Sequence, residues 1–305
     1  MAQARIPVDL LNPGQVFACL GLLEAAEVLC GDADGGFDWS NPAAAHFILR
    51  ATGENNPVQT VLEFLASAVP KRIAAEGYSD PPPKKHSNTQ DEVGADEIMP
   101  SRLDPPEIMD TFPAPKSEGM TLPIHIGGGN RPVVELNHWA DGSGRDTFKL
   151  YAGNRSAFHI ASAMLGGNGS KHSSYGIRQL WKANPQLLIK QPFDVLTAMG
   201  GSFNFDPRGA WTAIDTGYSP NSQGHAVEAS PVLEFLAAWG LTNSRPMQIA
   251  DRLYGYSAWE TMLPLVLARP AIARTLDVFP LRCFRFRLAL SGKNKVITFA
   301  IEDKQ

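Results

Sequence analysis

The chain has 305 residues, a formal net charge of −4 and 44% hydrophobic residues, which is typical of a globular protein with a sizeable core. It holds no uncharged apolar run of ~18 residues, so the sequence predicts no transmembrane helix. The N-terminal stretch MAQARIPVDLLNPG lacks the basic-then-apolar layout of a signal peptide. We therefore expect a cytoplasmic protein with no membrane partner.

Cysteine and histidine usage predicts neither a metal centre nor a cofactor. The three cysteines, Cys19, Cys30 and Cys283, are odd in number and form no CxxC pair. This pattern favours a reducing compartment over a disulfide framework or a thiolate zinc site. The seven histidines form no HExxH or HxH motif, and the GxSxG motif of a nucleophile elbow is absent.

The first 76 residues predict alternating strands and helices. Asn12 is a favourable helix N-cap, Pro13 fits the first helical position, and Gln15 is placed to complete a capping box. The helix expected from Gly14 to about Cys30 is apolar nearly all round, so we expect it to be buried, and Gly31 ends it. The other expected elements are strands at 5–11, 37–39, 46–51 and 71–75, and a helix opened by Asn56-Pro57 that runs to about residue 69.

Residues 77–119 differ from the rest of the chain because they combine many prolines with mixed charges. A stretch of roughly 40 residues with this composition predicts a long proline-rich loop or flexible insertion. Apart from this insertion, we expect residues 1–305 to form a single domain.

The remaining elements predict an α+β fold, in which an antiparallel or mixed sheet packs with helices. The C-terminal hairpin is the clearest element, with Phe284, Phe286 and Leu288 on one strand face. Arg285 and Arg287 lie on the opposite face, which indicates either a polyanion contact or, as we favour, the solvated side of a half-buried sheet. The expected strands are 122–126, 131–136, 147–151, 252–256, 281–290 and 295–301, and the expected helices are 156–165, 175–183, 193–199, 231–239 and 257–267. We expect the N-terminal strand, the middle strands and the hairpin to share one sheet.

A basic stretch lies in the middle of this acidic protein. Residues 145–208, named the basic island here, hold eight basic and three acidic side chains, a local charge of +5. Such a local excess indicates a polyanion site better than overall charge does. Glycines interrupt the island where a backbone would approach a ligand, and aromatic residues alternate with the charges, as base stacking and phosphate contacts require. The alternative is a solvated face beside ordinary helix-capping glycines.

Three stretches together carry a family resemblance. They are IPVDLLNPGQVFACLGLLEAAEVL, HWADGSGRDTFKLYAGNRSAFHIASAML, and SFNFDPRGAWTAIDTGYSPN followed by PVLEFLAAWGLTNSRP. The pattern resembles accessory and large-subunit-like proteins of type I CRISPR–Cas systems, most closely type I-U, also called I-G. It covers most of the chain outside the proline-rich insertion, and its motifs are diffuse rather than catalytic.

The resemblance implies a subunit of an RNA-guided surveillance complex that binds crRNA or target DNA. Its implied partners are other CRISPR-associated effector subunits, and the separate nuclease-helicase is left open as a further one. The chain is short for a large subunit, so small-subunit, backbone and adaptor roles stay open.

We therefore expect a non-catalytic, nucleic-acid-binding subunit that contacts the nucleic-acid backbone. The side chains expected at the nucleic acid are Lys149, Tyr151, Arg155, Lys171, His172, Tyr175, Arg178, Lys182 and Arg208. Two alternatives stay open. One is a metal-dependent nucleic-acid-processing enzyme of the same locus that uses Asp206, Asp215 or His172, although Asp206-Pro207 is a routine turn former. The other is a purely protein–protein adaptor.

Overall fold

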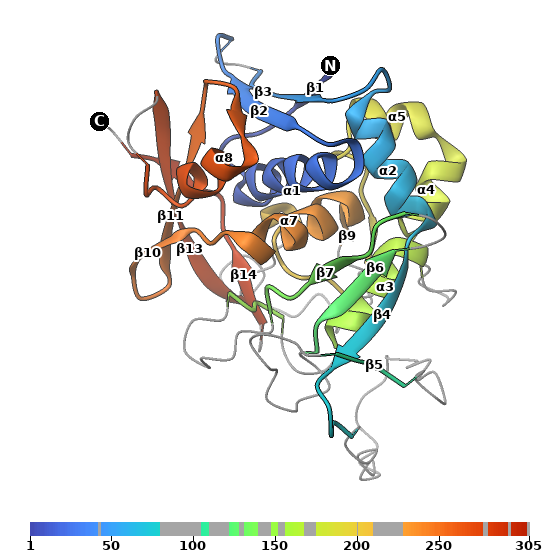
Figure 1. The fold of residues 1–305 in the computed structure, drawn as a ribbon. Coiled ribbons are helices and arrows are strands. Elements are labelled where there is room, and N and C mark those ends of the chain that lie inside the picture. Colours follow the sequence, from blue (N-terminus) through green and yellow to red (C-terminus); the bar gives the residue numbers. More distant parts are fainter. Residues whose placement is uncertain are drawn as a thin grey trace.

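A computed structural model of the chain confirms the α+β class, with helices packed against antiparallel and mixed sheets (Figure 1). The structure describes residues 1–41, 44–79, 105–109, 122–127, 131–139, 148–151, 156–167, 175–199, 201–209, 228–276, 280–291 and 294–303.

Two buried helices, α1 (Pro13–Cys30) and α7 (Pro231–Asn243), lie side by side in the middle of the fold (Figure 1). Their backbones touch at glycines. A Cβ atom on Gly21 would lie 1.9 Å from the carbonyl oxygen of Leu236, and one on Gly240 would lie 2.6 Å from that of Phe17. Only residues without a side chain permit so close a crossing, so these glycines fix the centre of the core.

The capping signals at the start of α1 act as predicted, with one difference. The Asn12 side chain accepts a hydrogen bond from the backbone N–H of Gln15. The Gln15 side chain reaches past Asn12 and accepts from the backbone N–H of Asp9 at 2.7 Å. The helix ends at Gly31, whose φ of 77° lies in the left-handed region.

Of the described helices, α1 is long and apolar enough to cross a membrane, by length and composition alone. Yet 78% of it is buried inside the fold, and the core helix of a soluble protein meets the same criterion. Its one fully buried carboxylate, Glu24, is paired with Arg269, which donates to both carboxylate oxygens at 2.7 Å, and also accepts a hydrogen bond from the side-chain amide of Asn243. Glu24 therefore belongs to a core contact between α1, α7 and the helix α8 (Leu265–Ile272) that carries Arg269.

Two stretches of the chain begin with a helix and two strands and end with a helix. The first unit is α1, β2 (Ala33–Asp38), β3 (His46–Ala51) and α2 (Pro57–Ser67). The second is α7, β10 (Met247–Ala250), β11 (Leu253–Trp259), the two-residue strand β12 (Leu263–Pro264) and α8. In each unit the two strands that follow the first helix pair antiparallel. The two units meet at the crossing of α1 and α7, so the core lies between them.

The strands divide among several sheets, so the expectation of one shared sheet is wrong. One sheet has the order β1-β3-β2-β12, with β1 (Ala2–Pro7) and β12 (Leu263–Pro264) at its edges. A second has the order β10-β11-β13-β14, built on the long strand β13 (Leu281–Ser291), with β14 (Asn294–Ile297) beside it and β15 (Ile301–Glu302) also paired to β13. Phe284, Phe286 and Leu288 are buried, as the hairpin pattern predicted.

A third sheet has the order β5-β4-β6-β7. Its strands are β4 (Val69–Ala74), β5 (Glu107–Ile108), β6 (Ile124–Gly127) and β7 (Val134–Leu136). β5 lies within the proline-rich stretch and pairs parallel with β4, which makes this sheet mixed. Of residues 77–119, the structure describes 77–79 and 105–109, so part of the expected insertion returns to a sheet and the rest lies outside the described residues.

Several elements expected from the sequence need correction. Residues 193–199 are not helical: the helix α5 (Pro185–Lys190) precedes them, and the short strand β8 (Thr197–Ala198) pairs with β9 (Glu228–Ala229). Residues 257–267 begin as the end of strand β11, because Trp259 is buried against the first sheet and donates to the carbonyl of Gly35. Residues 148–151 form no strand.

Candidate nucleic-acid interface

The basic helix α4 (Ile177–Ala183) lies across the C-terminal end of α2 (Figure 1). Arg178 of α4 donates from Nε to the carbonyl of Ala66 at 2.9 Å and from Nη2 to that of Ala68 at 3.1 Å. The last carbonyls of a helix have no partner within the helix, and a cation there also offsets the negative end of the helix dipole. Arg178 therefore closes α2 and is held in one orientation.

The N-terminal end of α4 packs on the C-terminal end of α3 (Ala157–Gly166). The side-chain amide of Gln179 donates to the carbonyl of Gly166. A Cβ atom on Gly176 would lie 2.3 Å from the backbone nitrogen of Gly167. Gly176 thus serves close contact between two pieces of backbone, which corrects the expectation that this glycine lets a ligand approach.

An open pocket of about 350 Å³ lies between α2 and α4. We name it the α2–α4 pocket, and its lining residues are Glu63, Ala66, Ser67, Arg131, Arg178, Trp181 and Lys182. Three cationic side chains and one carboxylate face this space, and an indole ring forms part of its wall. Such a combination suits an anionic ligand that carries an aromatic group.

The pocket residues differ in how many of their groups the fold already uses. Arg131 and Lys182 are exposed, and neither forms an ion pair with any residue that the structure describes. The indole N–H of the half-buried Trp181 makes no hydrogen bond within the described part of the chain, whereas those of Trp139 and Trp259 donate to backbone carbonyls. Arg131, Lys182 and Trp181 are therefore the groups available to a ligand.

Two of the expected nucleic-acid contacts, Arg178 and Lys182, lie together in this pocket. A third, Tyr175, is exposed just before α4, and its backbone N–H donates to the hydroxyl of Thr197. Three other expected contacts lie outside the described residues: Arg155, Lys171 and His172.

Tyr151 is buried, which corrects its expected role as a stacking platform. Its ring packs edge-on to Phe203 at a centroid distance of 5.9 Å, and burial raises the pKa of its hydroxyl. The ammonium of Lys149 lies 4.5 Å from the centroid of the same ring. The pair forms an internal cation–π contact, so the Tyr151 ring offers no open face to a base.

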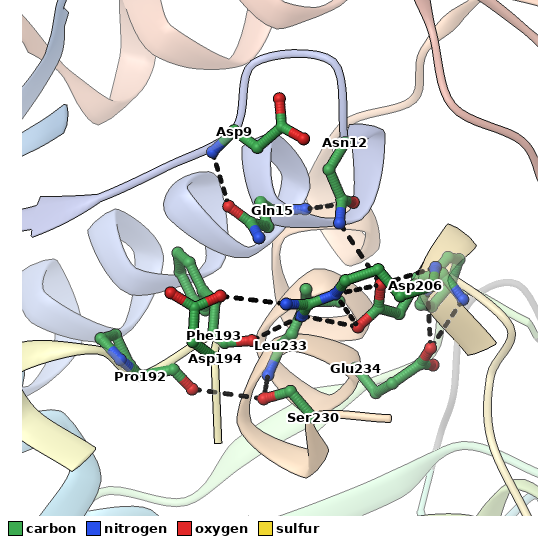
Figure 2. A network of polar contacts seen from close by, with 12 residues as sticks. Asp9, Asn12, Gln15, Pro192, Phe193, Asp194, Asp206, Ser230, Leu233 and Glu234 are labelled. Atoms are coloured by element: carbon green, nitrogen blue, oxygen red, sulfur yellow. Dashed lines mark hydrogen bonds and ion pairs between the residues drawn. The ribbon is translucent and has the colours of Figure 1, made fainter. Parts of the chain in front are cut away.

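Arg208, one of the expected phosphate contacts, is held in a polar network with Asp194 and Asp206, which are labelled in Figure 2. Its Nε lies 3.0 and 3.1 Å from the two carboxylate oxygens of Asp206, and its Nη1 lies 2.9 Å from Asp194. Its Nη2 donates to the carbonyl of Phe193 at 2.5 Å. The two neighbouring carboxylates already offset its charge, and each of its three nitrogens donates to a partner within the fold.

The same network buries a carboxyl group at the start of α7 (Figure 2). Glu234 Oε1 accepts from the backbone N–H groups of Phe205 and Asp206 at 2.9 and 2.8 Å. Burial, with the charge of Asp206 as a second cause, raises the pKa of Glu234 to about 8. Asp206 also accepts from the side chain of Asn12 at 3.3 Å, so the network ties the start of α1 to that of α7.

Of the residues that the enzyme hypothesis names, the structure describes Asp206. The Asp206 carboxylate is buried and paired with Arg208, and no group of three or more His, Cys, Asp or Glu residues in the described part of the chain could hold a metal ion. Asp215 and His172, the other residues of the enzyme hypothesis, lie outside the described residues.

Sequence reasoning missed part of the pocket. Trp181 lies between Arg178 and Lys182 in the basic island, and this position is the sequence signal that could have identified it. Arg131 and Glu63 lie outside the island, and no local pattern links them to α4. Three comparisons, with protein-family models, with curated proteins and with solved structures, found no match to this chain.

Proposed function

We propose that this protein binds nucleic acid without catalysing a reaction on it, as a subunit of a type I CRISPR RNA-guided surveillance complex in antiviral defence. The observation that carries the nucleic-acid part is the α2–α4 pocket, where Arg131 and Lys182, which form no ion pair within the described part of the chain, line the same space as the indole ring of Trp181. The assignment to such a complex rests on the resemblance of the three sequence stretches to type I-U (I-G) proteins.

The charge distribution favours a specific site over general adhesion to polyanions. The whole chain carries a formal charge of −4. The pocket is lined by three cations and one carboxylate, a local charge of +2. Opposite local and overall charges attract a polyanion to the pocket and repel it elsewhere. In an RNA-guided complex the protein contacts the backbone while base pairing reads the sequence, so crRNA and target DNA are both suitable ligands.

The geometry of the cations supports phosphate binding. Arg178 and Lys182 lie one helical turn apart on α4, and Arg131 follows strand β6, so cations from two elements converge on one space. Arg178 is fixed by two backbone carbonyls, which reduces the side-chain entropy lost when a phosphate binds beside it.

The proposed setting is the cytoplasm, with other effector subunits as protein partners and no cofactor. The burial of Asp206 and its pairing with Arg208 argue against the enzyme alternative, which uses this carboxylate. The adaptor alternative makes a different prediction about nucleic acid, so one experiment tests both readings.

That experiment is co-expression of the tagged chain with its neighbouring genes, followed by a nuclease-protection assay on the purified material. The proposal predicts a stoichiometric assembly that holds a discrete small RNA. An assembly of this chain with partner proteins in which no subunit binds nucleic acid would favour the adaptor alternative. A lone protein without RNA would contradict the proposal.

A further inference from the structure

We propose that the α2–α4 pocket takes one unpaired nucleotide of a single strand, with its phosphate on Arg131 and Lys182 and its base on the face of Trp181. The inference rests on the proposed function and specifies which form of nucleic acid this site takes.

The shape of the site favours an unpaired nucleotide. Its volume of about 350 Å³ lies near the lower end of the range for pockets that hold small molecules, so it has room for one nucleotide and not for a helix. The indole ring forms part of the pocket wall, which a base can reach only by leaving its stack. Bases within a duplex stay stacked on their neighbours, and unpairing them costs free energy that a single strand does not pay.

Trp181 has the properties of a stacking platform. Its ring is half-buried, so part of it packs against the core and fixes its orientation while the rest faces the pocket. Stacking on an indole tolerates any base, because every base has a π-face. We therefore expect binding at this site to depend on strandedness and to depend little on sequence.

The charged groups set the direction of the ligand. Arg131 and Lys182 are the exposed cations, whereas Arg178 has two of its donors committed to the carbonyls of Ala66 and Ala68. Glu63 repels a phosphate, and one of its oxygens already accepts from Gln59 at 2.9 Å. The phosphate therefore lies toward Arg131 and Lys182 and away from Glu63.

The test compares three labelled RNAs of one sequence by fluorescence anisotropy: a single strand, its blunt duplex, and the duplex with one bulged nucleotide. Trp181→Ala should weaken binding of the single strand and of the bulged duplex about tenfold, and leave the blunt duplex unchanged. Trp181→Phe keeps an aromatic face and should retain most of the affinity. Thermal unfolding of both variants checks that the fold is intact, and the phenylalanine variant keeps the test valid if the alanine variant unfolds.

The outcomes separate this inference from the function on which it rests. If the wild-type protein binds all three RNAs and Trp181→Ala changes none of them, or all equally, the inference is wrong while nucleic-acid binding stands. If neither the three RNAs nor a single-stranded DNA of the same sequence binds, both proposals are wrong. A competition arm with adenosine monophosphate distinguishes the source of the nucleotide: displacement of the single strand at equal nucleotide concentration would mean a free-nucleotide site and would overturn the strand assignment.

Discussion

Arg178 and Ala66, 112 residues apart in the chain, are joined by a hydrogen bond of 2.9 Å from the guanidinium Nε to the backbone carbonyl. Through this contact, α4 closes the C-terminal end of α2, and the wall of the α2–α4 pocket becomes part of the folded core. The pocket is therefore formed before a ligand arrives. The Arg178 side chain contributes to both the stability of the fold and the affinity for a ligand, and substitutions can separate the two effects.

Arg178→Ala should lower both stability and nucleic-acid affinity. The carbonyls of Ala66 and Ala68 lose a charged donor, which we expect to reduce the free energy of unfolding by about 1–2 kcal/mol. Lys182→Ala is the matched control: this lysine is exposed, so its loss should change stability by no more than about 0.5 kcal/mol while still weakening binding. Urea denaturation measures the first effect, and equal stability of the two variants would contradict the capping role.

Gly21→Ala should destabilise the protein severely. The added methyl group would lie 1.9 Å from the carbonyl oxygen of Leu236, so α1 and α7 would have to separate. We expect a loss of about 3 kcal/mol or more, the range of overpacking at a rigid backbone contact. Gly166→Ala is the control, because a Cβ atom there meets only the Arg178 guanidinium at 3.5 Å. Similar denaturation midpoints for the two variants would refute close helix contact.

Stability should fall with rising pH through Glu234. Burial raises the pKa of this carboxyl from its ordinary 4.5 to about 8 in the folded chain. Between these values the folded chain holds a proton that the unfolded chain has released, so each pH unit costs up to about 1.4 kcal/mol. The contribution is fully present below the ordinary pKa and is lost as the pH rises through about 8.

Glu234→Gln tests this pH dependence, because the amide cannot titrate and its oxygen can still accept from the N–H groups of Phe205 and Asp206. The difference in unfolding free energy between variant and wild type should shift in favour of the variant from pH 5 to pH 8. A constant difference for Glu234→Gln would show that this carboxyl titrates normally.

The ion pair of Glu24 with Arg269 should matter through the cost of leaving a carboxylate alone in the core. Arg269→Met removes both 2.7 Å contacts and leaves Glu24 with Asn243. We expect a loss of about 2 kcal/mol, less than for a fully buried pair, because the Arg269 side chain is 37% exposed. The double variant Glu24→Gln with Arg269→Met should recover part of the loss in a denaturant titration. No recovery would mean that the arginine acts through packing alone.

Local signals in the sequence predicted much of the secondary structure. An N-cap followed by proline marked the starts of α1, α2 and α7 at Asn12, Asn56 and Ser230, and each cap side chain makes the expected bond. The same signal at Asn184 marks α5 and was overlooked. The division into sheets was not predictable, because it depends on pairing between distant strands such as β2 with β12.

The candidate site was predictable only in part. The spacing of Arg178 and Lys182 placed both on one face of a helix, and both line the pocket. Tyr151 and Arg208 are residue types that often contact nucleic acid. Tertiary packing nevertheless buries Tyr151 and pairs Arg208 with Asp206 and Asp194. Charge along the chain does not reveal which cations the fold neutralises.

The measurement that tests the central claim most directly is the salt dependence of single-stranded RNA affinity in the double variant Arg131→Ala with Lys182→Ala. Each lost phosphate contact should reduce the slope of log affinity against log salt by about 0.7, so the pair should reduce it by about 1.4. The control is Arg287→Ala with Lys295→Ala, which removes one exposed arginine and one exposed lysine from the β13–β14 hairpin, away from the pocket (Figure 1). A flattened slope in the first double variant alone is the predicted result. An equal slope in the wild type and both double variants would show that the α2–α4 pocket does not bind the nucleic-acid backbone.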